Sequence, residues 1–381
     1  MPLSRIVILF ALLGMARPSR VPAQSRSRPA EPSRLRGTVD LSIGAADETR
    51  DAYLFGIIGG LATDAQGRII VADSKDHTVR VFAANGRHLY TLGRKGKGPG
   101  DLNGPCCLTV AKDGLLWVKE NGNHRYSAFR LGATEASFVR SIRGATNSVW
   151  SADRVDFDVT GKLLDLGSAF NPATKAFRIV RHHVDSTGTA VASDTIPKPP
   201  ADSLSDVTFA TRNGTATYVQ PHGARELHAF GGTGDMAHAV SSRYAVTWVT
   251  VDGRRRALVQ RPAVAGPALS GTEHQAAGEL LNTIARNTGV PRANLALKIP
   301  DRKMPLQSLG FDLDGRLWVE RSVVDGAPGE ADVYDRSGQW SAIMEWPADV
   351  KMRFWTVRGR TGIGVAEDED GGQRVVRVQF R

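Results

Sequence analysis

The sequence predicts an all-β chain that folds as a six-bladed β-propeller, closed by a strand from the N-terminus and carrying one helical insertion between blades four and five. Three observations predict this fold: a segment repeated around a turn glycine, a second turn glycine in each repeat, and an unused β-prone run near the N-terminus. At 381 residues, the chain is also long enough for an array of modules.

The repeated segment has apolar runs on both sides of its glycine. Residues 61–71, 108–118 and 155–165 are copies of this segment, and residues 309–319 repeat it closely. Apolar, β-prone runs around Asp, Asn and Gly are typical of a tight hairpin, so each copy predicts two strands, a and b. Six such glycines are found, at intervals of 47, 47, 53, 101 and 47 residues: Gly67, Gly114, Gly161, Gly214, Gly315 and Gly362.

A second turn glycine follows in each unit and predicts a second hairpin, strands c and d. Four strands in 40 to 50 residues is the period of a propeller blade. These second glycines are Gly86, Gly132, Gly188, Gly253, Gly338 and Gly372.

The sixth unit is one strand short. The remaining β-prone run of suitable length is residues 39–43, at the other end of the chain. A propeller must join its first and last blades to cover their edges. We therefore expect residues 39–43 to supply the fourth strand of blade six.

The long interval between the fourth and fifth glycines predicts an insertion at about residues 264–304. Ser270 and Glu273 match a capping box, and Gly289 matches a helix stop. The apolar residues Ala277, Leu280, Leu281, Ile284 and Ala285 fall on one face of this helix. We expect that face to pack against the propeller, and a partner-binding surface is the alternative.

The chain resembles the NHL repeat in its first two units. Residues 71–82 have its Val-Ala-Asp opening and Val-x-Val-Phe close, and residues 120–125 look like the same segment in the second unit. The fifth unit matches partly, and the others match only through the turn glycines. The resemblance implies a six-bladed propeller of an exported bacterial type, and it implies a fold far more than an activity.

The N-terminus predicts export. A positive start, an apolar run at residues 6–16 and small residues before Gln24 are typical of a signal peptide, residues 1–23, cleaved after Ala23. A membrane anchor is the alternative, but a span needs about 20 apolar residues. We expect a flexible basic tail at residues 24–36, the propeller at residues 37–381, and a periplasmic or secreted protein without a membrane span.

Composition limits the partners. Loss of Arg5, Arg17 and Arg20 with the signal lowers the net charge from +10 to +7. The remaining basic residues are scattered without interleaved aromatic residues, so nucleic acid is not an expected partner. We expect a monomer.

Cys106 and Cys107 are the only cysteines. Neighbours in a strand point to opposite faces, which favours two packed thiols, and a disulfide between them is the alternative.

Loop topology predicts where binding occurs. In a four-stranded blade, the b–c loops and the connections from strand d to the next strand a share one face. Residues 94–101, the helical insertion, and residues 220–243, interpreted as a b–c loop of blade four, all fall on it. Long loops on a rigid scaffold often carry binding sites. The candidate binding residues are Asp73, His77, Arg94, Lys95, Lys97, Glu120, His124, Arg125, Gln220, His222, Glu320, Arg321 and Asp368.

The sequence contains no catalytic or metal-binding motif, and no cofactor or metal is predicted. We expect an exported, non-enzymatic module that binds a protein, peptide or glycan on the loop-bearing face. The alternative is a metal-dependent propeller hydrolase or lyase, similar to lactonases, with its site in the central channel.

Overall fold

The computed structural model describes residues 32–44, 49–145, 154–171, 176–196, 204–211, 214–232, 234–250, 254–368 and 370–381. The expected signal peptide lies outside the described residues, as does most of the expected tail. Within the described residues, no helix is both long and apolar enough to cross a membrane.

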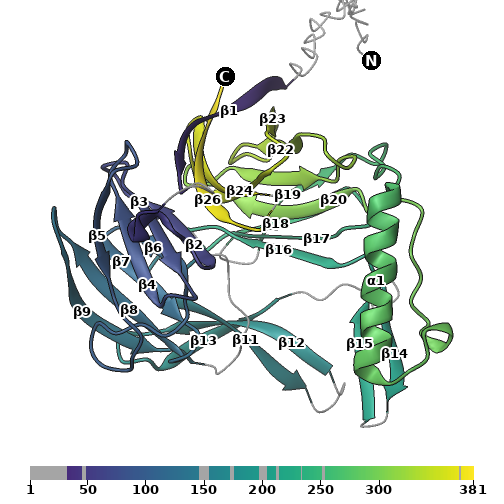
Figure 1. Cartoon of the computed structure of the whole chain (residues 1–381), viewed down its shortest axis with the longest axis horizontal. Coiled ribbons are helices and arrows are strands. Elements are labelled where there is room, and N and C mark those ends of the chain that lie inside the picture. The colour runs from purple at the N-terminus through teal and green to yellow at the C-terminus, as the bar shows by residue number, and fades with distance from the viewer. Residues whose placement is uncertain are drawn as a thin grey trace, which may run out of the picture. The chain divides into compact units, whose positions relative to one another are not determined.

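Blades one to three are four-stranded antiparallel sheets whose strands follow chain order (Figure 1). A short helix, η1 (Asp51–Tyr53), precedes them. Their strands are β2 (Ile58–Thr63), β3 (Ile69–Asp73), β4 (Thr78–Phe82), β5 (His88–Leu92), β6 (Pro105–Val110), β7 (Leu115–Glu120), β8 (Arg125–Leu131), β9 (Ala136–Arg143), β10 (Asp156–Phe157), β11 (Leu163–Asn171), β12 (Ala176–Val184) and β13 (Ala190–Thr195).

Blades four to six follow a separate hairpin formed by β14 (Asp206–Thr211) and β15 (Gly214–Val219). Blade six takes β1 as its fourth strand. The strands are β16 (Glu226–Phe230), β17 (Met236–Val240), β18 (Ala245–Val249) and β19 (Arg255–Gln260), then β20 (Leu306–Phe311), β21 (Leu317–Arg321), β22 (Gly329–Tyr334) and β23 (Trp340–Trp346), then β24 (Val350–Arg358), β25 (Thr361–Glu367), β26 (Gln373–Phe380) and β1 (Ser33–Ile43).

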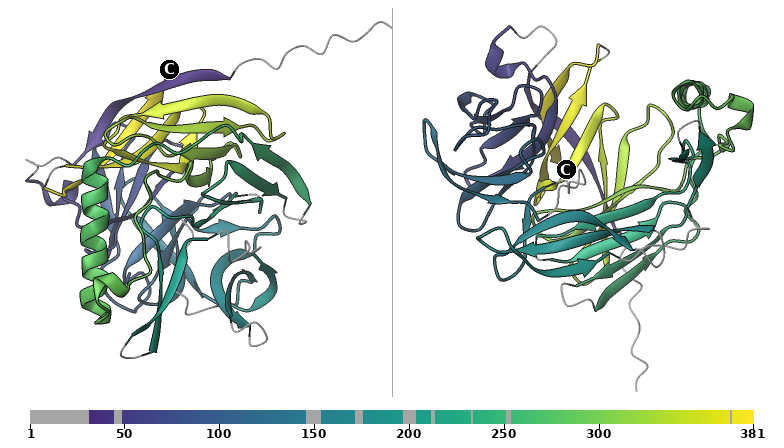
Figure 2. Two further views of the ribbon diagram at one scale, coloured as in Figure 1. Left: turned by 90° about the vertical axis from the view of Figure 1, so that its right-hand side faces the viewer. Right: turned by 90° about the horizontal axis from the view of Figure 1, so that it is seen from below.

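The closing strand is confirmed and is longer than expected. Residues 37–43 of β1 pair antiparallel with β26, and this range includes the expected residues 39–43. Ser33 to Arg36 then pair parallel with β23 of blade five, which joins blades five and six in one eight-stranded sheet. In Figures 1 and 2, β1 runs along the C-terminal strands. Residues 33–36 are therefore strand, not flexible tail.

Apolar packing joins five of the six neighbouring blade pairs. One cluster of buried side chains spans blades one and two, and others span two and three, four and five, five and six, and six and one. Among the described residues, no such cluster joins blades three and four. There, Arg181 of β12 donates a hydrogen bond to the carbonyl of Gly234 at 3.2 Å and lies over the ring of Phe230.

The assignment of blade four from its turn glycine was wrong. Gly214 turns the separate β14–β15 hairpin, whereas the a–b turn of blade four contains Gly231 and Gly234. Residues 220–243, expected to form a b–c loop, instead contain β16 and β17. The error has a physical reason, because Asn-Gly chemistry stabilises any tight hairpin, whether or not it belongs to a blade.

The turn of blade six also shifts. Gly362 lies inside β25, and the β24–β25 turn uses Gly359, which has a φ of 58°. Both glycines precede the same apolar run, so spacing alone did not distinguish them.

The insertion contains the expected helix, α1 (Gly271–Thr288), and a short helix, η3 (Arg292–Asn294). Ser270 and Glu273 form the capping box, and Gly289 ends α1 in the left-handed conformation with a φ of 69°. Leu281 and Ile284 of the helix cluster with Phe209 and Tyr218 of the β14–β15 hairpin. Figure 1 shows α1 running beside this hairpin. The apolar face therefore packs on a second insertion rather than on a blade.

Cys106 and Cys107 form a disulfide, so the expectation of two thiols was wrong. The pairing of β6 with β7 shifts register between Pro105 and Leu108. This irregularity interrupts the regular alternation on which the expectation rested.

Candidate ligand-binding site

A cavity of about 840 Å³ opens on the face that carries the connections between blades. One wall comes from the two insertions, through residues 219–223 at the end of β15 and Glu273, Ala277 and Leu280 of α1. The other wall comes from the beginnings of β20 and β24 and the end of β21. Leu306 of β20 pairs with Arg321 of β21, which places these strand ends at one edge of blade five. A cavity of this size suits a small-molecule ligand or a short chain segment.

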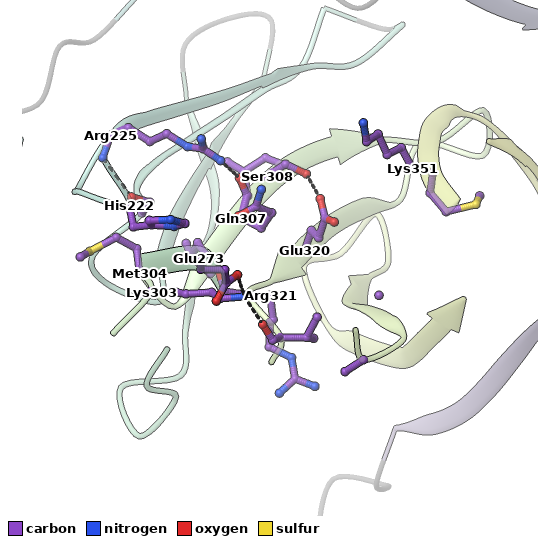
Figure 3. A pocket seen from close by; sticks show the side chains of 18 of the residues that line it. His222, Arg225, Glu273, Lys303, Met304, Gln307, Ser308, Glu320, Arg321 and Lys351 are labelled. Atoms are coloured by element: carbon purple, nitrogen blue, oxygen red, sulfur yellow. Dashed lines mark hydrogen bonds and ion pairs between the residues drawn. The ribbon is translucent and has the colours of Figure 1, made fainter. Parts of the chain in front are cut away.

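The cavity is lined by more cations than carboxylates (Figure 3). Its carboxylates are Glu273 and Glu320. Its cationic side chains are Arg225, Lys303, Arg321, Lys351 and Arg353.

Three of the five cations form ion pairs within the protein. Lys303 pairs with Glu273 and also donates to the carbonyl of Val323 at 2.8 Å. Arg321 pairs with Glu330, and Lys351 lies 2.8 Å from Glu367. Burial would raise the pKa of Glu273, but the Lys303 ammonium and the backbone amide of Ser270 hold it below its usual range. These three cations are therefore largely neutralised before any ligand arrives.

Arg225 and Arg353 form no ion pair within the described parts of the chain. Arg225, which directly precedes β16, donates to the carbonyl of Gln307 at 2.6 Å, and this bond orients its guanidinium group (Figure 3). The guanidinium carbon of Arg353, in β24, lies 5.6 Å from the centre of the Trp355 ring. Both side chains keep donors that can reach a ligand.

Glu320, near the end of β21, also lines the cavity. The hydroxyl of Ser308 donates a hydrogen bond to its carboxyl group (Figure 3). Burial raises the pKa of Glu320, and the Ser308 hydrogen bond and the positive charges of Arg225 and Arg353 oppose this only in part. The carboxyl group therefore keeps its proton to a higher pH than an exposed glutamate and can then donate a hydrogen bond.

His222 stands at the rim in a turn closed by the hydrogen bond from the Gly223 amide to the Gln220 carbonyl. Its φ is 54°, an uncommon value for a residue other than glycine. Burial, with the positive charges of Lys303 and Arg225, lowers the pKa of His222 despite the opposing charge of Glu273. The neutral ring can both donate and accept hydrogen bonds.

A second cavity, of about 850 Å³, lies next to the first. It extends toward Arg36 and Gly37 of β1. The residues that line both cavities are Arg321, Ser322, Val323, Ala327 and Trp346. The two cavities therefore form neighbouring parts of one groove along the edge of blade five.

The structure brings together four of the residues predicted from sequence: Gln220, His222, Glu320 and Arg321 all line the first cavity. The Gln220 side chain also accepts a hydrogen bond from the amide of Lys298 at 3.3 Å.

Asp73 and Glu120 instead have structural roles, and both are 0% exposed. Asp73 accepts hydrogen bonds from the amides of Gly56 at 2.8 Å and Asp76 at 3.1 Å. Glu120 accepts hydrogen bonds from Arg125 at 2.8 Å and Ser127 at 2.5 Å. Neither carboxylate reaches a ligand on the surface.

The loop at residues 94–101 is held by Arg125, which donates to the carbonyls of Lys97 at 2.9 Å, Gly98 at 3.0 Å and Asp101 at 2.8 Å. Arg94 pairs with Asp101, while Lys95 and Lys97 are exposed. None of these residues lines either cavity.

The remaining predicted residues also lie outside the two cavities. His77 accepts a hydrogen bond on Nδ1 from the amide of Gly104 at 2.9 Å. His124 adopts a positive φ in its turn, and Asp368 accepts from the amide of Gly372 at 2.5 Å. Of these bonds, the one at Asp368 closes a local turn, whereas the one at His77 joins it to a residue 27 positions along the chain.

Sequence reasoning missed Arg225, Ser308, Lys303, Lys351 and Arg353. Arg225 was hidden by the wrong assignment of blade four. The run from Lys351 to Phe354 alternates polar and apolar residues, so a period of two could have identified Lys351 and Arg353 as facing away from the core.

No cluster of three or more His, Cys, Asp or Glu side chains suited to a metal ion is found among the described residues.

Comparison with known proteins supports the fold. Residues 46–124 match a family described as a 6-bladed beta-propeller. No curated protein matches the chain by sequence. A protein from Bacteroides fragilis, named as a candidate exported protein, has a similar structure, with 11% identity over 91% of this chain and 95% of that chain and a TM-score of 0.50.

Two enzymes have more distant structural similarity. Virginiamycin B lyase from Staphylococcus aureus shares 10% identity over 90% of this chain and 99% of its own, with a TM-score of 0.40. The PQQ-bound aldose sugar dehydrogenase from Streptomyces coelicolor shares 12% over 93% and 100%, with a TM-score of 0.40. The blade topology and the family match agree that this chain is a six-bladed β-propeller.

Proposed function

We propose that this protein is an exported binding protein that holds a segment of a peptide or glycan in the cavity between its two insertions and blades five and six. The signal peptide expected at residues 1–23 would deliver it to the periplasm or the exterior. The observation that carries the proposal is the mixed lining of the cavity, where polar groups converge beside Leu280, Val323 and Trp355. Ligand sites combine apolar contact area with a few placed polar groups in this way.

The shape of the groove favours a chain segment over a compact ligand. The first cavity continues past Arg321 and Trp346 into the second. A ligand longer than the first cavity could therefore extend toward β1. The wall formed by the two insertions is held together by the apolar cluster between α1 and the β14–β15 hairpin. The site would therefore be largely formed before binding.

A substitution that fills the cavity tests this proposal. Leu280 on α1 is 49% exposed and lines the cavity, so Leu280→Trp adds a large ring to it without disturbing the buried face of the helix. Leu258 on β19 is 43% exposed and lines neither cavity, which makes Leu258→Trp a matched control. Glycan and peptide arrays would be probed with the native protein and both variants.

We expect Leu280→Trp to lose the ligands that the native protein and Leu258→Trp retain. Equal binding by all three proteins would refute the proposed site. Bound ligand would also be recovered after incubation and weighed by mass spectrometry. An unchanged mass supports binding alone, whereas a cleaved product would establish the hydrolase or lyase alternative.

A further inference from the structure

We propose that the cavity recognises a carboxylate on its ligand, and that Arg225 and Arg353 are the residues that bind it. This inference rests on the proposed function and adds the chemical class of the ligand. It begins from a difference among the cavity's five cations: three form ion pairs within the protein and these two do not.

The two arginines come from different elements and converge on one region. Arg225 directly precedes β16 in blade four, and Arg353 lies in β24 of blade six. Both line the cavity, and the charges of both act on the carboxyl group of Glu320 in β21. A ligand group close to Glu320 would therefore be attracted by both positive charges.

The chemistry of the arginines favours a carboxylate. A guanidinium group presents donors in a planar fork that matches the two oxygens of a carboxylate. The carbonyl of Gln307 fixes one nitrogen of Arg225 at 2.6 Å, and the Trp355 ring supports Arg353. Pre-oriented donors lose less conformational entropy when a ligand binds.

Glu320 does not supply the missing counter-charge. Its carboxyl group accepts the hydrogen bond of Ser308, and neither arginine lies within ion-pair distance of it in the described chain. A ligand carboxylate would thus supply the negative charge that Arg225 and Arg353 lack within the described chain. In its protonated form, Glu320 could donate a further hydrogen bond to that carboxylate.

Acidic glycans and acidic peptides both carry this group, so the test uses both sources. Trigalacturonate and triglutamate would be titrated by calorimetry into the native protein, with maltotriose and triglutamine as uncharged counterparts. Three variants would be compared: Arg225→Ala, Arg353→Ala and Lys351→Ala. Lys351→Ala is the matched control, because it removes the same charge from the same cavity but from a side chain paired with Glu367.

We expect at least one acidic ligand to bind, and each arginine variant to weaken it by about 10- to 100-fold, the loss typical of a charge-assisted hydrogen bond. Lys351→Ala should change affinity by less than about threefold, because Glu367 already offsets the charge of Lys351. The acidic ligand that binds identifies the source of the carboxylate.

Two outcomes would overturn the inference. Acidic and uncharged ligands could bind equally, or the three variants could lose equal affinity, which would mean that net charge acts without a specific carboxylate site. In either case, Leu280→Trp shows whether only the carboxylate assignment has failed or the proposed binding site has failed as well. If Leu280→Trp abolishes the remaining binding, the cavity is the ligand site and only the carboxylate assignment is wrong.

Discussion

Ser308 of β20 and Glu320 of β21 face each other across neighbouring strands and share a hydrogen bond inside the cavity. The pair holds a carboxyl group that burial makes difficult to ionise. Placing such a group in an open cavity costs stability when it is charged. Costs of this kind are common at binding sites, where function and stability compete.

Glu320→Gln should therefore stabilise the protein, and more so at high pH. The pKa of Glu320 is raised on folding, so the native protein is most stable below the unfolded pKa of about 4.3 and loses stability as pH rises through the folded value. Glutamine does not titrate. The melting temperature of the variant, relative to native, should be higher at pH 8 than at pH 4. The exposed Glu279→Gln is the control, and the same trend in both would contradict the assignment.

The N-terminal strand should stabilise the ring in two steps. In a mature chain starting at Gln24, deleting residues 24–31 leaves every described pairing of β1 in place. Deleting residues 24–36 removes the parallel pairing with β23 and the ion pairs of Arg34 with Glu330 and Glu345. Deleting residues 24–44 also removes the antiparallel pairing with β26 and exposes its edge.

We expect nearly native melting for the first deletion, a drop of several degrees for the second, and aggregation or loss of cooperative unfolding for the third. Each backbone hydrogen bond lost costs about 0.5 to 1.5 kcal/mol, against a total stability of about 5 to 15 kcal/mol. Equal melting temperatures for all three deletions, measured by calorimetry, would show that β1 does not close the ring.

His183 should stabilise blade three in a limited pH range. Its ring lies 2.8 Å from Asp158 and 2.9 Å from Asp194. Burial alone would lower the pKa of His183, but its hydrogen bonds to the two carboxylates raise it. Burial would raise the pKa of both aspartates, but hydrogen bonds from His183, with those of Thr160 to Asp158 and Arg181 to Asp194, hold it below the usual range. The histidine contribution is complete below its unfolded pKa of about 6.5 and is lost above the folded value.

The aspartate contributions follow the opposite direction, being present above about pH 3.9 and lost as pH falls. His183→Gln should thus lower the melting temperature most between about pH 4 and 6.5, and less at pH 9. His182→Gln removes a neighbouring ring that contacts the Ser193 hydroxyl instead of a carboxylate and serves as the control. An equal loss at pH 5 and pH 9 for His183→Gln would contradict the ion-pair account.

The boundary between blades three and four should be the first to open. Every other blade pair shares a buried apolar cluster, whereas the described residues at this boundary meet through Arg181, Gly234 and Phe230. Local opening favours regions with few buried apolar contacts. In native-state hydrogen exchange, amides of β12 and β16 should exchange sooner than those of β3 and β21. Slower exchange in β12 and β16 would refute this weak point.

The sequence predicted the parts of the fold that depend on local chemistry. Blades one and two, the cap at Ser270 and the stop at Gly289 follow from short-range patterns, and the pairing of residues 39–43 follows from the strand missing in blade six. Hairpin turns alone do not say which hairpins join a blade, because Gly214 has the same turn chemistry as a blade glycine. That distinction depends on pairing with distant strands.

The candidate site was predicted less well for a similar reason. Asp73 and Glu120 are polar, so the sequence made them surface candidates, yet their burial and their hydrogen bonds depend on the folded loops around them. Conversely, Arg225 and Arg353 lie 128 positions apart in the chain and line the same cavity only because the ring places blades four and six on either side of blade five. No local pattern contains that relationship.

The most direct test of the account is to locate a bound ligand by hydrogen exchange. Native protein would be compared with and without a saturating amount of whichever ligand the arrays identify. We expect protection at residues 219–225, 303–309 and 350–355, which line the first cavity. Protection confined to residues 94–101, on the loop held by Arg125, would contradict the account and move the binding site to the connection between blades one and two.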